Sequence, residues 1–399
     1  MHILMIAPEP FFEPRGTPFS EFHRIRALTS LGHTVDLATY PFGRDVEMPG
    51  LRIHRSFKPP FLSRVKIGPS WAKVPLDLAL SLTATRLAMT RRYDAVHSHE
   101  EGGAIGVLLA KLMRKPHLYD MHSSLPQQVE NFGYGHSTWL ARVLGWLERL
   151  MIRKSRVVIV ICPELEVTAR GVDADVPIVL IENAAGSGAA PVAGTGAAVR
   201  AKLGLSAETP VVLYTGTFEA YQGFDLLFGA MADVIRTRHD ARLVMVGGDA
   251  DQIERMRAKV AALGLVEHVI FTGQRPSEEI PAYLDAATVL VSPRSSGTNT
   301  PLKIYQYLRS GRAIVATRLR THTQVLSEDT AILADPTPAA FGAAILRGLS
   351  DPEFGDRIGR NARTLADTKY TEAAYLAKTE IACAALARVP GGAVVERQT

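Results

Sequence analysis

The sequence predicts an α/β fold of two doubly wound domains, and three observations support this. Short apolar, β-branched runs alternate with amphipathic helical patterns along nearly the whole chain. Between residues 210 and 317 each run ends at Gly, Ser, Thr or Asp before a helix starts, which is typical of parallel strands joined by crossover helices. The length of 399 residues exceeds what one hydrophobic core usually serves. Such sheets bind ligands at the carboxyl ends of their strands.

The first domain is expected to span residues 1–183. Its helix over residues 17–32 has a single apolar stripe, formed by Phe19, Phe22, Ile25, Leu28 and Leu31. The other expected elements follow in order: the strands HILMIAP, VDLATY, DAVHSH, HLYDMHS, VVIVICP and PIVLIEN, with helices over GGAIGVLLAKLM and WLARVLGWLERLMIRK.

The second domain is expected over residues 210–365, where VVLYTG, LVMVGG, VIFTG and VLVSP read as strands ending in polar loops. Residues 184–209 form the expected linker region, because much of this segment consists of Ala, Gly, Ser, Pro and Val. A helix over residues 366–389 is expected to pack back toward the N-terminal domain. The tail, residues 390–399, is expected to be disordered.

The composition of the chain argues against several classes of protein, namely disulfide-rich, zinc-binding and membrane-spanning proteins. Cys162 and Cys383 are too few and too isolated for a disulfide framework or a zinc cluster, so a reducing cytoplasm is the expected compartment. The first residues, MHILMIAPEP, lack a basic leader and read as a strand. No run approaches the roughly 20 apolar residues that a membrane span needs.

The formal charge of +5 is unevenly placed. Apolar and cationic residues alternate after residue 52, and this segment is expected to adsorb on an anionic membrane surface, at the inner face of the membrane. A surface loop whose aromatic side chains enter the core is the alternative. Nucleic acid is not expected, because no groove-reading motif accompanies the charge. The expected membrane contacts are Phe57, Lys58, Phe61, Arg64, Lys66 and Trp71.

Taken together, these motifs resemble the retaining glycosyltransferases of family 4, which have the GT-B fold. GHTVDLATY is similar to the family's GHEVTV strand and DAVHSH to its DVVHAH. The run from LVMVGGDADQ to VLVSPR is similar to the family's second domain almost element by element. The resemblance covers nearly the whole chain. It implies two Rossmann-like domains that face each other across a cleft, with a sugar nucleotide held mainly by the second domain and an acceptor by the first.

The resemblance also implies site residues in the first domain. The loop PRGTPF places Gly16 and Thr17 beside the donor phosphates; Gly16 permits close backbone approach and Thr17 can cap the next helix, although a simple turn is the alternative. His122 takes the position of a family histidine that contacts the donor sugar near the reacting carbon. His99 and Glu100 are expected on the acceptor side. A packing role for His99 and a solvated loop for Glu100 stay open.

The chain departs from the family in its donor-site motifs. An Arg and a Lys that clamp the diphosphate in the family correspond here to Thr217 and Gln222. Two family glutamates, eight positions apart, correspond to Thr298 and Gln306. Two cations and two carboxylates are therefore missing together, which preserves the charge balance of the site.

The remaining groups still predict an anion site. The residues of GTNT precede Pro301, and proline is favoured at the first position of a helix, so Thr300 is the expected N-cap. We expect Lys303 and Arg294 to supply the missing charge. Lys303 is also expected to act with His122 in catalysis. The alternative is that Lys303 is an ordinary surface residue of a helix. The other expected donor contacts are Gly216, Gly248, Gln274, Arg275, Gly297, Thr298 and Asn299.

No metal ion or cofactor is expected. Asp249 and Asp251 have the spacing of a metal motif but open a helix, so we interpret them as capping residues. The expected function is metal-independent hexosyl transfer from a nucleotide sugar to a saccharide or lipid-linked acceptor, in cell-envelope polysaccharide or glycolipid synthesis. One alternative is a non-catalytic nucleotide-sugar-binding or scaffold protein on a degenerate GT-B fold. The second is a sugar-nucleotide epimerase.

Overall fold

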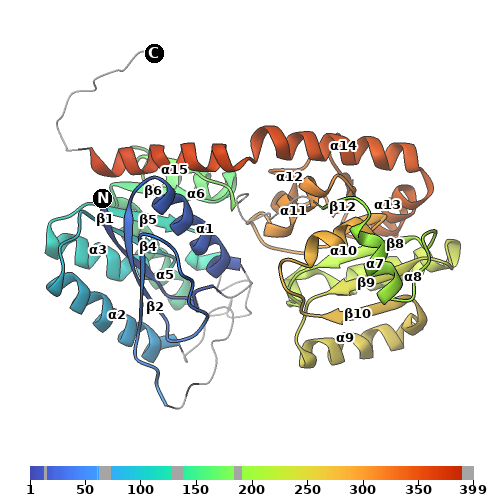
Figure 1. Ribbon diagram of the computed structural model, residues 1–399, viewed down its shortest axis with the longest axis horizontal. Coiled ribbons are helices and arrows are strands. Elements are labelled where there is room, and N and C mark those ends of the chain that lie inside the picture. The colour runs from blue at the N-terminus through green and yellow to red at the C-terminus, as the bar shows by residue number, and fades with distance from the viewer. Residues whose placement is uncertain (13–15, 61, 63–72, 128–137, 184–190, 389–399) are drawn as a thin grey trace. The chain divides into compact units, whose positions relative to one another are not determined.

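The computed structural model describes residues 1–12, 16–60, 62, 73–127, 138–183 and 191–388 (Figure 1). The chain divides into two compact units. The first contains Met1–Glu182 together with Ala373–Thr399, and the second contains Asn183–Glu372. Among the described helices, none combines the length and the apolar character that crossing a membrane requires.

A parallel sheet of seven strands forms the centre of the first unit, in the order β3-β2-β1-β4-β5-β6-β7. Its strands are β1 His2–Ala7, β2 Thr34–Thr39, β3 Leu51–Arg55, β4 Ala95–His99, β5 His117–Met121, β6 Val157–Val160 and β7 Ile178–Leu180. Its helices are α1 Gly16–Ser30, α2 Lys73–Thr90, α3 Gly102–Met113, α5 Thr138–Lys154, α6 Pro163–Val172 and α15 Glu372–Ala387.

Alternate residues of β1 pack into two different cores, because successive side chains of a strand point to opposite faces. Ile3 and Met5 pack with Ile25 of α1 and Cys383 of α15. Leu4 and its neighbours on the other face pack with residues of α2 and α3. Helices α1 and α15 therefore cover one face of the sheet, and α2 and α3 cover the opposite face (Figure 1).

A parallel sheet of six strands forms the second unit, in the order β10-β9-β8-β11-β12-β13. Its strands are β8 Val211–Thr215, β9 Arg242–Val246, β10 Val269–Gly273, β11 Val289–Ser292, β12 Ala313–Thr317 and β13 Ile332–Ala334. Its helices are α7 Thr195–Lys202, α8 Phe224–Thr237, α9 Ala250–Ala262, α10 Ile280–Ala286, α11 Leu302–Ser310, α12 Arg320–Thr323, α13 Pro338–Ser350 and α14 Pro352–Lys369, with 3-10 turns η2 Ala220–Gln222 and η3 Val266–His268.

The predicted pair of doubly wound parallel sheets is confirmed. Strand β3 was not predicted, because its sequence LRIHR alternates apolar with basic residues and reads as part of the basic segment. Within the expected linker, Thr195–Lys202 forms α7, which packs against α10 and donates the Gly196 backbone N–H to Asp285 Oδ2 at 2.8 Å. The expected tail, residues 390–399, lies outside the described residues.

Helix α15 belongs to the first unit although it comes last in the sequence. Lys378 forms an ion pair with Glu182 at the end of the first unit's N-terminal segment. Thr379 accepts a hydrogen bond from Arg24 Nη1 at 3.3 Å, and the Arg24 guanidinium lies over the Tyr375 ring at 5.0 Å. These contacts, together with the apolar packing of Cys383, fix α15 against α1.

Candidate functional site

Each sheet reverses its strand order at one point, and the candidate residues follow the strands that flank these two points. In the first unit the reversal lies between β1 and β4, and in the second between β8 and β11. A ligand crevice is expected at the carboxyl ends of the strands at such a point, because the two loops there diverge. The loops after β8 and β11 carry most of the predicted donor residues.

The loops after β8 and β11 are tied to each other. Gly223 has φ +76° and lies so close to Pro293 that a Cβ atom would meet the Pro293 carbonyl oxygen at 2.0 Å. The backbone N–H of Ser295 donates to the Tyr221 carbonyl at 3.1 Å. This close approach requires glycine and gives the two loops a fixed spacing.

Lys303 lies between these loops and is buried. Its Nζ donates to Gln222 Oε1 at 3.3 Å and lies 3.6 Å from the centre of the Tyr214 ring. A Cβ atom on Gly216 would lie 3.4 Å from the same Nζ. Burial, and to a smaller extent the charge of Arg294, lowers the pKa of Lys303 well below its ordinary value. Lys303 is therefore a buried residue that contacts the loop after β8, and not an exposed side chain on the surface of α11.

Thr217 and Gln222, where the family has cations, thus lie next to a lysine from another element. Gln222 is buried and contacts the Lys303 ammonium directly. The Thr217 carbonyl accepts a hydrogen bond from Tyr214, whose ring faces Lys303. The loop after β8 has no cationic side chain at these two positions, and the amino group of Lys303 from α11 lies beside it.

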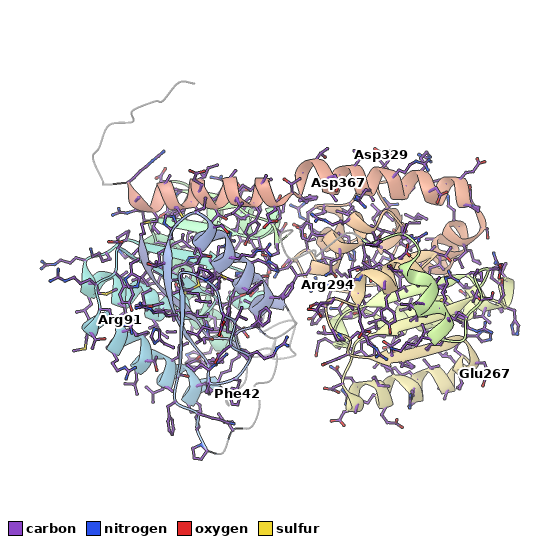
Figure 2. The ribbon with its side chains drawn as sticks, viewed as in Figure 1. Phe42, Arg91, Glu267, Arg294, Asp329 and Asp367 are labelled. Atoms are coloured by element: carbon purple, nitrogen blue, oxygen red, sulfur yellow. The ribbon has the colours of Figure 1, made fainter. Side chains whose placement is uncertain are left out.

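Arg294 (labelled in Figure 2) supports the loop that precedes α11. Its Nη1 donates to the Asn299 carbonyl at 2.6 Å and to Thr321 Oγ1 at 3.0 Å. Gly297, at φ +104°, leaves room for this guanidinium, which a Cβ atom would approach to 3.2 Å. The Thr298 carbonyl accepts a hydrogen bond from Gln324 Nε2 at 2.8 Å. The loop is therefore held through its backbone carbonyls.

The expected N-cap of α11 is wrong by one residue. The helix begins at Leu302, and Pro301 occupies the N-cap position with φ −63° and ψ 133°. Proline cannot cap with a side chain, so the amides of the first turn receive no capping side chain. Thr300 lies before the cap, and within the described part of the chain its buried Oγ1 has no hydrogen-bond partner.

The other predicted donor residues lie at differing distances from the reversal point. Gly248 follows β9 at φ +76°, and the Phe218 ring occupies the space where its Cβ would lie. Gln274 is exposed and Arg275 half-buried; both follow the edge strand β10, which β9 separates from β8. Gln306 is half-buried on α11, one turn after Lys303. The structure therefore brings Gln222, Gly216 and Lys303 together, but not Gln274.

The capping interpretation of Asp249 is confirmed. The Gln252 backbone N–H donates to Asp249 Oδ1 at 2.8 Å, and the Gln252 side chain accepts from the Asp249 backbone at 3.1 Å. This reciprocal pair is a capping box.

In the first unit, His99 and His122 meet at the ends of neighbouring strands. His99 Nδ1 and His122 Nε2 are 3.1 Å apart, and His122 Nε2 lies 3.2 Å from Asp120 Oδ1. His97 Nε2 lies 3.3 Å from Asp120 Oδ2, and the His97 ring stacks on that of His99. Register explains the grouping, because His99 pairs with Asp120 across β4 and β5.

Arg24 neutralises this buried cluster. Its Nε donates to Asp120 Oδ2 at 2.8 Å. Burial alone would raise the pKa of Asp120, but the charge of Arg24, followed by the effect of His122, holds that pKa well below its ordinary value. Burial lowers the pKa of His99, so its imidazole is neutral. His97, His99 and Asp120 offer three ligand atoms within 4.8 Å, yet Arg24 already compensates the carboxylate and explains the arrangement without an ion.

Glu100 does not lie in a solvated loop. It is buried, with φ +46°, and accepts hydrogen bonds from Ser123 Oγ at 3.1 and 2.9 Å. Burial, followed by the charge of Glu101, raises the pKa of Glu100 well above its ordinary value. Glu101 instead pairs with Lys73 Nζ at 2.9 Å. Glu100 is therefore a buried acid beside the histidine cluster.

Helix α1 begins before Thr17, the residue that was expected to cap it. Gly16 is its first residue, so Thr17 lies inside the first turn and is not the N-cap. Gly16 is exposed, and a Cβ atom there would meet no atom of the described residues within 4 Å. The helix buries Glu21 and Arg24, which sequence reasoning missed because charged residues between apolar ones read as a solvent face.

Glu21 is completely buried, and neither carboxylate oxygen has a hydrogen-bond partner among the described residues. Burial, and then the charges of Glu9 and other carboxylates, raises its pKa well above its ordinary value. Burial therefore favours the protonated form of the Glu21 carboxyl, and the nearby Asp120 and Glu100 act in the same direction.

Of the expected membrane contacts, Phe57 and Lys58 lie within the described residues. Phe57 is exposed, and the Lys58 ammonium lies over the Phe42 ring at 5.3 Å. Phe61, Arg64, Lys66 and Trp71 lie outside the described residues.

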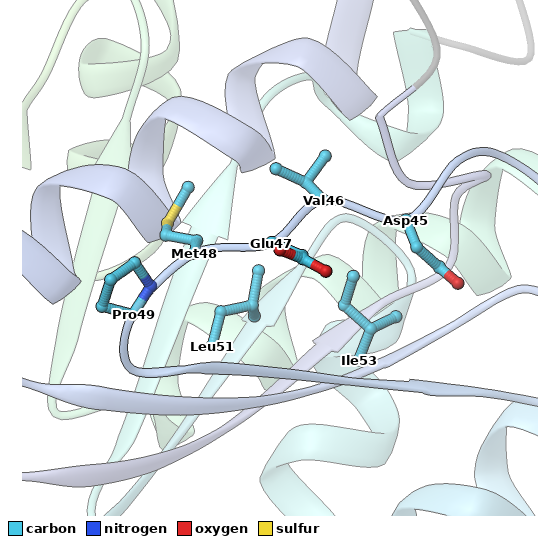
Figure 3. A pocket seen from close by; sticks show the side chains of 7 residues that line it. All are labelled: Asp45, Val46, Glu47, Met48, Pro49, Leu51 and Ile53. Carbon is cyan, nitrogen blue, oxygen red and sulfur yellow. The ribbon is translucent and has the colours of Figure 1, made fainter.

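A surface hollow lies in the first unit beside β3 (Figure 3). Its lining includes Asp45 and Glu47 with apolar neighbours from the β2–β3 connection. None of the predicted donor or acceptor residues lines it, and β3 is the edge strand farthest from β7.

Two doubly wound sheets with polar loops at both reversal points define a protein of the GT-B class. The sequence matches two family models, "Glycosyl transferase 4-like domain" over residues 23–184 and "Glycosyl transferases group 1" over residues 209–351. The chain belongs to this group 1, family 4-like family of glycosyltransferases.

Individual proteins agree with this assignment. The α-D-kanosaminyltransferase of Streptomyces kanamyceticus is 25% identical over 320 residues, which cover 76% of this chain and 79% of that one. Sucrose-phosphate synthase from Thermosynechococcus elongatus has a similar fold, with TM-score 0.76, 23% identity and coverage of 95% and 97%. Anabaena HepE, solved with UDP-glucose, gives TM-score 0.73, 16% identity and coverage of 96% and 99%. The predicted GT-B fold is therefore confirmed.

Proposed function

We propose that the protein transfers a hexosyl group from a nucleoside diphosphate sugar to a saccharide or lipid-linked acceptor, with retention at the anomeric carbon. Buried Lys303, at the reversal point of the second sheet, carries this proposal. Among the described residues its Nζ contacts an amide oxygen and an aromatic ring but no carboxylate. A buried ammonium without a counter-charge is costly, and a diphosphate would supply that charge.

The surrounding backbone suits the same ligand. The start of α11 presents amides without a capping side chain, and helix N-termini favour anions. A bound diphosphate would raise the lowered pKa of Lys303 and so favour its charged form. A related fold, that of HepE, was solved with UDP-glucose, which supports a nucleotide-sugar donor.

The proposed chemistry requires no enzyme carboxylate as base. The acceptor hydroxyl oxygen bonds to the anomeric carbon on the face from which the diphosphate departs. The bond from the anomeric carbon to the diphosphate oxygen breaks, and that oxygen takes the hydroxyl proton. Lys303 stabilises the charge on the departing diphosphate, and His122 positions the donor sugar. Because the diphosphate oxygen takes the proton, this mechanism is compatible with the uncharged side chains of Thr298 and Gln306.

The acceptor is proposed to lie against the first unit. Glu100 and His99 lie at the strand ends there, and a carboxyl group and an imidazole both suit hydrogen bonds to sugar hydroxyls. A lipid-linked acceptor of envelope polysaccharide or glycolipid synthesis agrees with the basic, aromatic character of residues 52–92.

Calorimetry with UDP, GDP and ADP, followed by product analysis with the matching nucleotide sugar, tests the proposal. We expect one diphosphate to bind and its sugar to be transferred with an unchanged anomeric configuration. If no diphosphate binds, the chain is a scaffold on a degenerate fold. Conversion of the donor sugar without any acceptor would indicate the epimerase alternative.

A further inference from the structure

Three neighbouring helices of the first unit expose an unusual surface. Helix α3 packs against both α2 and α5, and the inner sides of α2 and α3 cover the same face of the sheet (Figure 1). Helix α5 shares its core with Ala104 of α3. The outward sides of α2, α3 and α5 therefore form one continuous surface, here called the three-helix face.

Helix α5 contributes a stripe of tryptophan and arginine. The exposed residues recur every three to four positions, so they project from one side of the helix. Trp139 is 70% and Trp146 57% exposed, although tryptophan rarely lies so open in a protein. The stripe consists of Trp139, Arg142, Trp146, Arg149 and Arg153.

Helix α2 is apolar on two opposite sides. Leu76 and Leu80 face the core. Leu78 and Leu82, each two positions further along, are 64% and 66% exposed. A helix packed on a sheet needs one apolar side, so the second remains unexplained by the fold. Leu108 and Leu112 of α3 extend this exposed apolar area toward α5.

No described side chain at an exposed position of these helices is acidic. Eight are apolar, six are cationic and one is a threonine. Helix α14 of the second unit differs: its exposed positions include Glu353, Asp356, Arg357, Arg360 and Asp367, and no large apolar side chain is exposed there. The three-helix face thus combines large apolar area with charge of one sign. The fifteen residues are Val74, Leu78, Leu82, Arg86, Met89, Thr90, Leu108, Lys111, Leu112, Trp139, Arg142, Trp146, Arg149, Arg153 and Lys154.

We infer that the three-helix face binds the surface of an anionic phospholipid bilayer. Leu, Met and Trp side chains enter the boundary between headgroups and acyl chains, and the cations meet the lipid phosphates. Tryptophan favours this boundary because its ring is apolar and its N–H is polar. The inference uses other residues than the segment at residues 57–71, and it does not depend on the transferase chemistry.

The intrinsic fluorescence of the protein reports this binding directly. The chain has three tryptophans, so Trp71→Phe leaves only the two on α5. With vesicles of equal parts phosphatidylglycerol and phosphatidylcholine we expect co-sedimentation, a blue shift of the emission and quenching by brominated lipid chains. With pure phosphatidylcholine, binding should be weak.

Each Arg→Gln exchange at Arg142, Arg149 or Arg153 should weaken partitioning about fivefold, which corresponds to about 1 kcal/mol per cation near the headgroups.

Control variants distinguish binding through the three-helix face from binding through the positive charge of the protein in general. Trp139→Ala with Trp146→Ala should abolish most binding, and both side chains are exposed, so the fold should persist. Arg357→Gln with Arg360→Gln removes charge from α14 and should leave vesicle binding unchanged.

An unshifted emission with anionic vesicles at physiological salt overturns the inference. So does a dimer in sedimentation velocity that the tryptophan variants abolish, because a second copy would then cover the face. Diphosphate calorimetry on the same variants should stay normal, which keeps this test distinct from the proposed function.

Discussion

Arg24 and Asp120 form an ion pair in the interior of the first unit, with 2.8 Å between Nε and Oδ2 and side chains only 1% and 0% exposed. Asp120 also meets the imidazoles of His97 and His122. Arg24 in turn contacts Thr379 and Tyr375 of α15. One ion pair therefore joins α15, the last of the described helices, to the histidine cluster at the strand ends.

Replacing Arg24 by Met should lower the free energy of unfolding of the first unit by about 3–5 kcal/mol. The substitution leaves Asp120 charged and buried without its cation, which is the costly case. Urea denaturation followed by circular dichroism measures the loss. Adding Asp120→Asn should recover part of it, because the uncompensated charge is then gone.

Arg170 provides the matched control, because it pairs with Glu166 one helical turn away on the surface of the same unit. Arg170→Met should cost less than about 1 kcal/mol. Equal losses for the two arginines would contradict the role assigned to Arg24.

Glu21→Gln should stabilise the protein at pH 8 and change little at pH 4. The folded-state pKa of Glu21 lies above its ordinary value of 4.5, since burial disfavours the carboxylate. Its stabilising contribution is therefore complete below pH 4.5 and is lost as the pH rises through the folded-state pKa. Melting temperatures of both proteins across this range test the sign, and a Gln variant that is less stable at pH 8 than at pH 4, relative to wild type, would refute it.

Lys303→Ala should weaken binding of the cognate nucleoside diphosphate by about 10- to 100-fold, the usual effect of losing a charge-assisted hydrogen bond. Wild-type protein should also take up a proton on binding, because the diphosphate raises the lowered pKa of the ammonium. Calorimetry in buffers of different ionisation enthalpy measures both effects. Lys259→Ala, on an exposed ion pair of α9, should change neither. Proton uptake that persists in Lys303→Ala would exclude this lysine as its source.

Gly223→Ala should destabilise the second unit by more than the backbone strain alone. Both Gly223 and Gly264 have positive φ, +76° and +68°, so an alanine at either costs about 1–2 kcal/mol of strain. At Gly223 the new Cβ also meets the Pro293 carbonyl at 2.0 Å, whereas Gly264 has nothing within 4 Å. Denaturation of both variants isolates the collision, and equal losses would mean that the loops after β8 and β11 can separate freely.

His122→Ala should lower kcat by about 100-fold while the dissociation constant of the nucleoside diphosphate stays unchanged. The expectation follows from a role in positioning the sugar, where small misplacements are costly. Initial rates and calorimetry on the same preparation give the two values. A weaker diphosphate affinity with normal kcat would assign His122 to ground-state binding instead.

Sequence patterns predicted both sheets and most of their strands, because these strands combine β-branched residues with a polar stop, a pattern that β3 lacks. They also placed Lys303 and Gln222 in one site through the family resemblance, and the structure brings the two within hydrogen-bond distance. Arg24 and Glu21 were missed, because nothing in a helical pattern tells a buried charge from an exposed one. Their partner elements, β5 and α15, come from distant parts of the sequence.

The two units differ in how they can be made separately. Residues 183–372 are one uninterrupted stretch of chain, so they can be expressed as a fragment that keeps Lys303 and its loops. The other unit needs both ends of the polypeptide, because α15 covers Ile3, Met5 and Leu28. A stop codon placed shortly after position 372 would leave the second unit intact, but it would remove α15 from the first unit and expose those apolar side chains to aggregation.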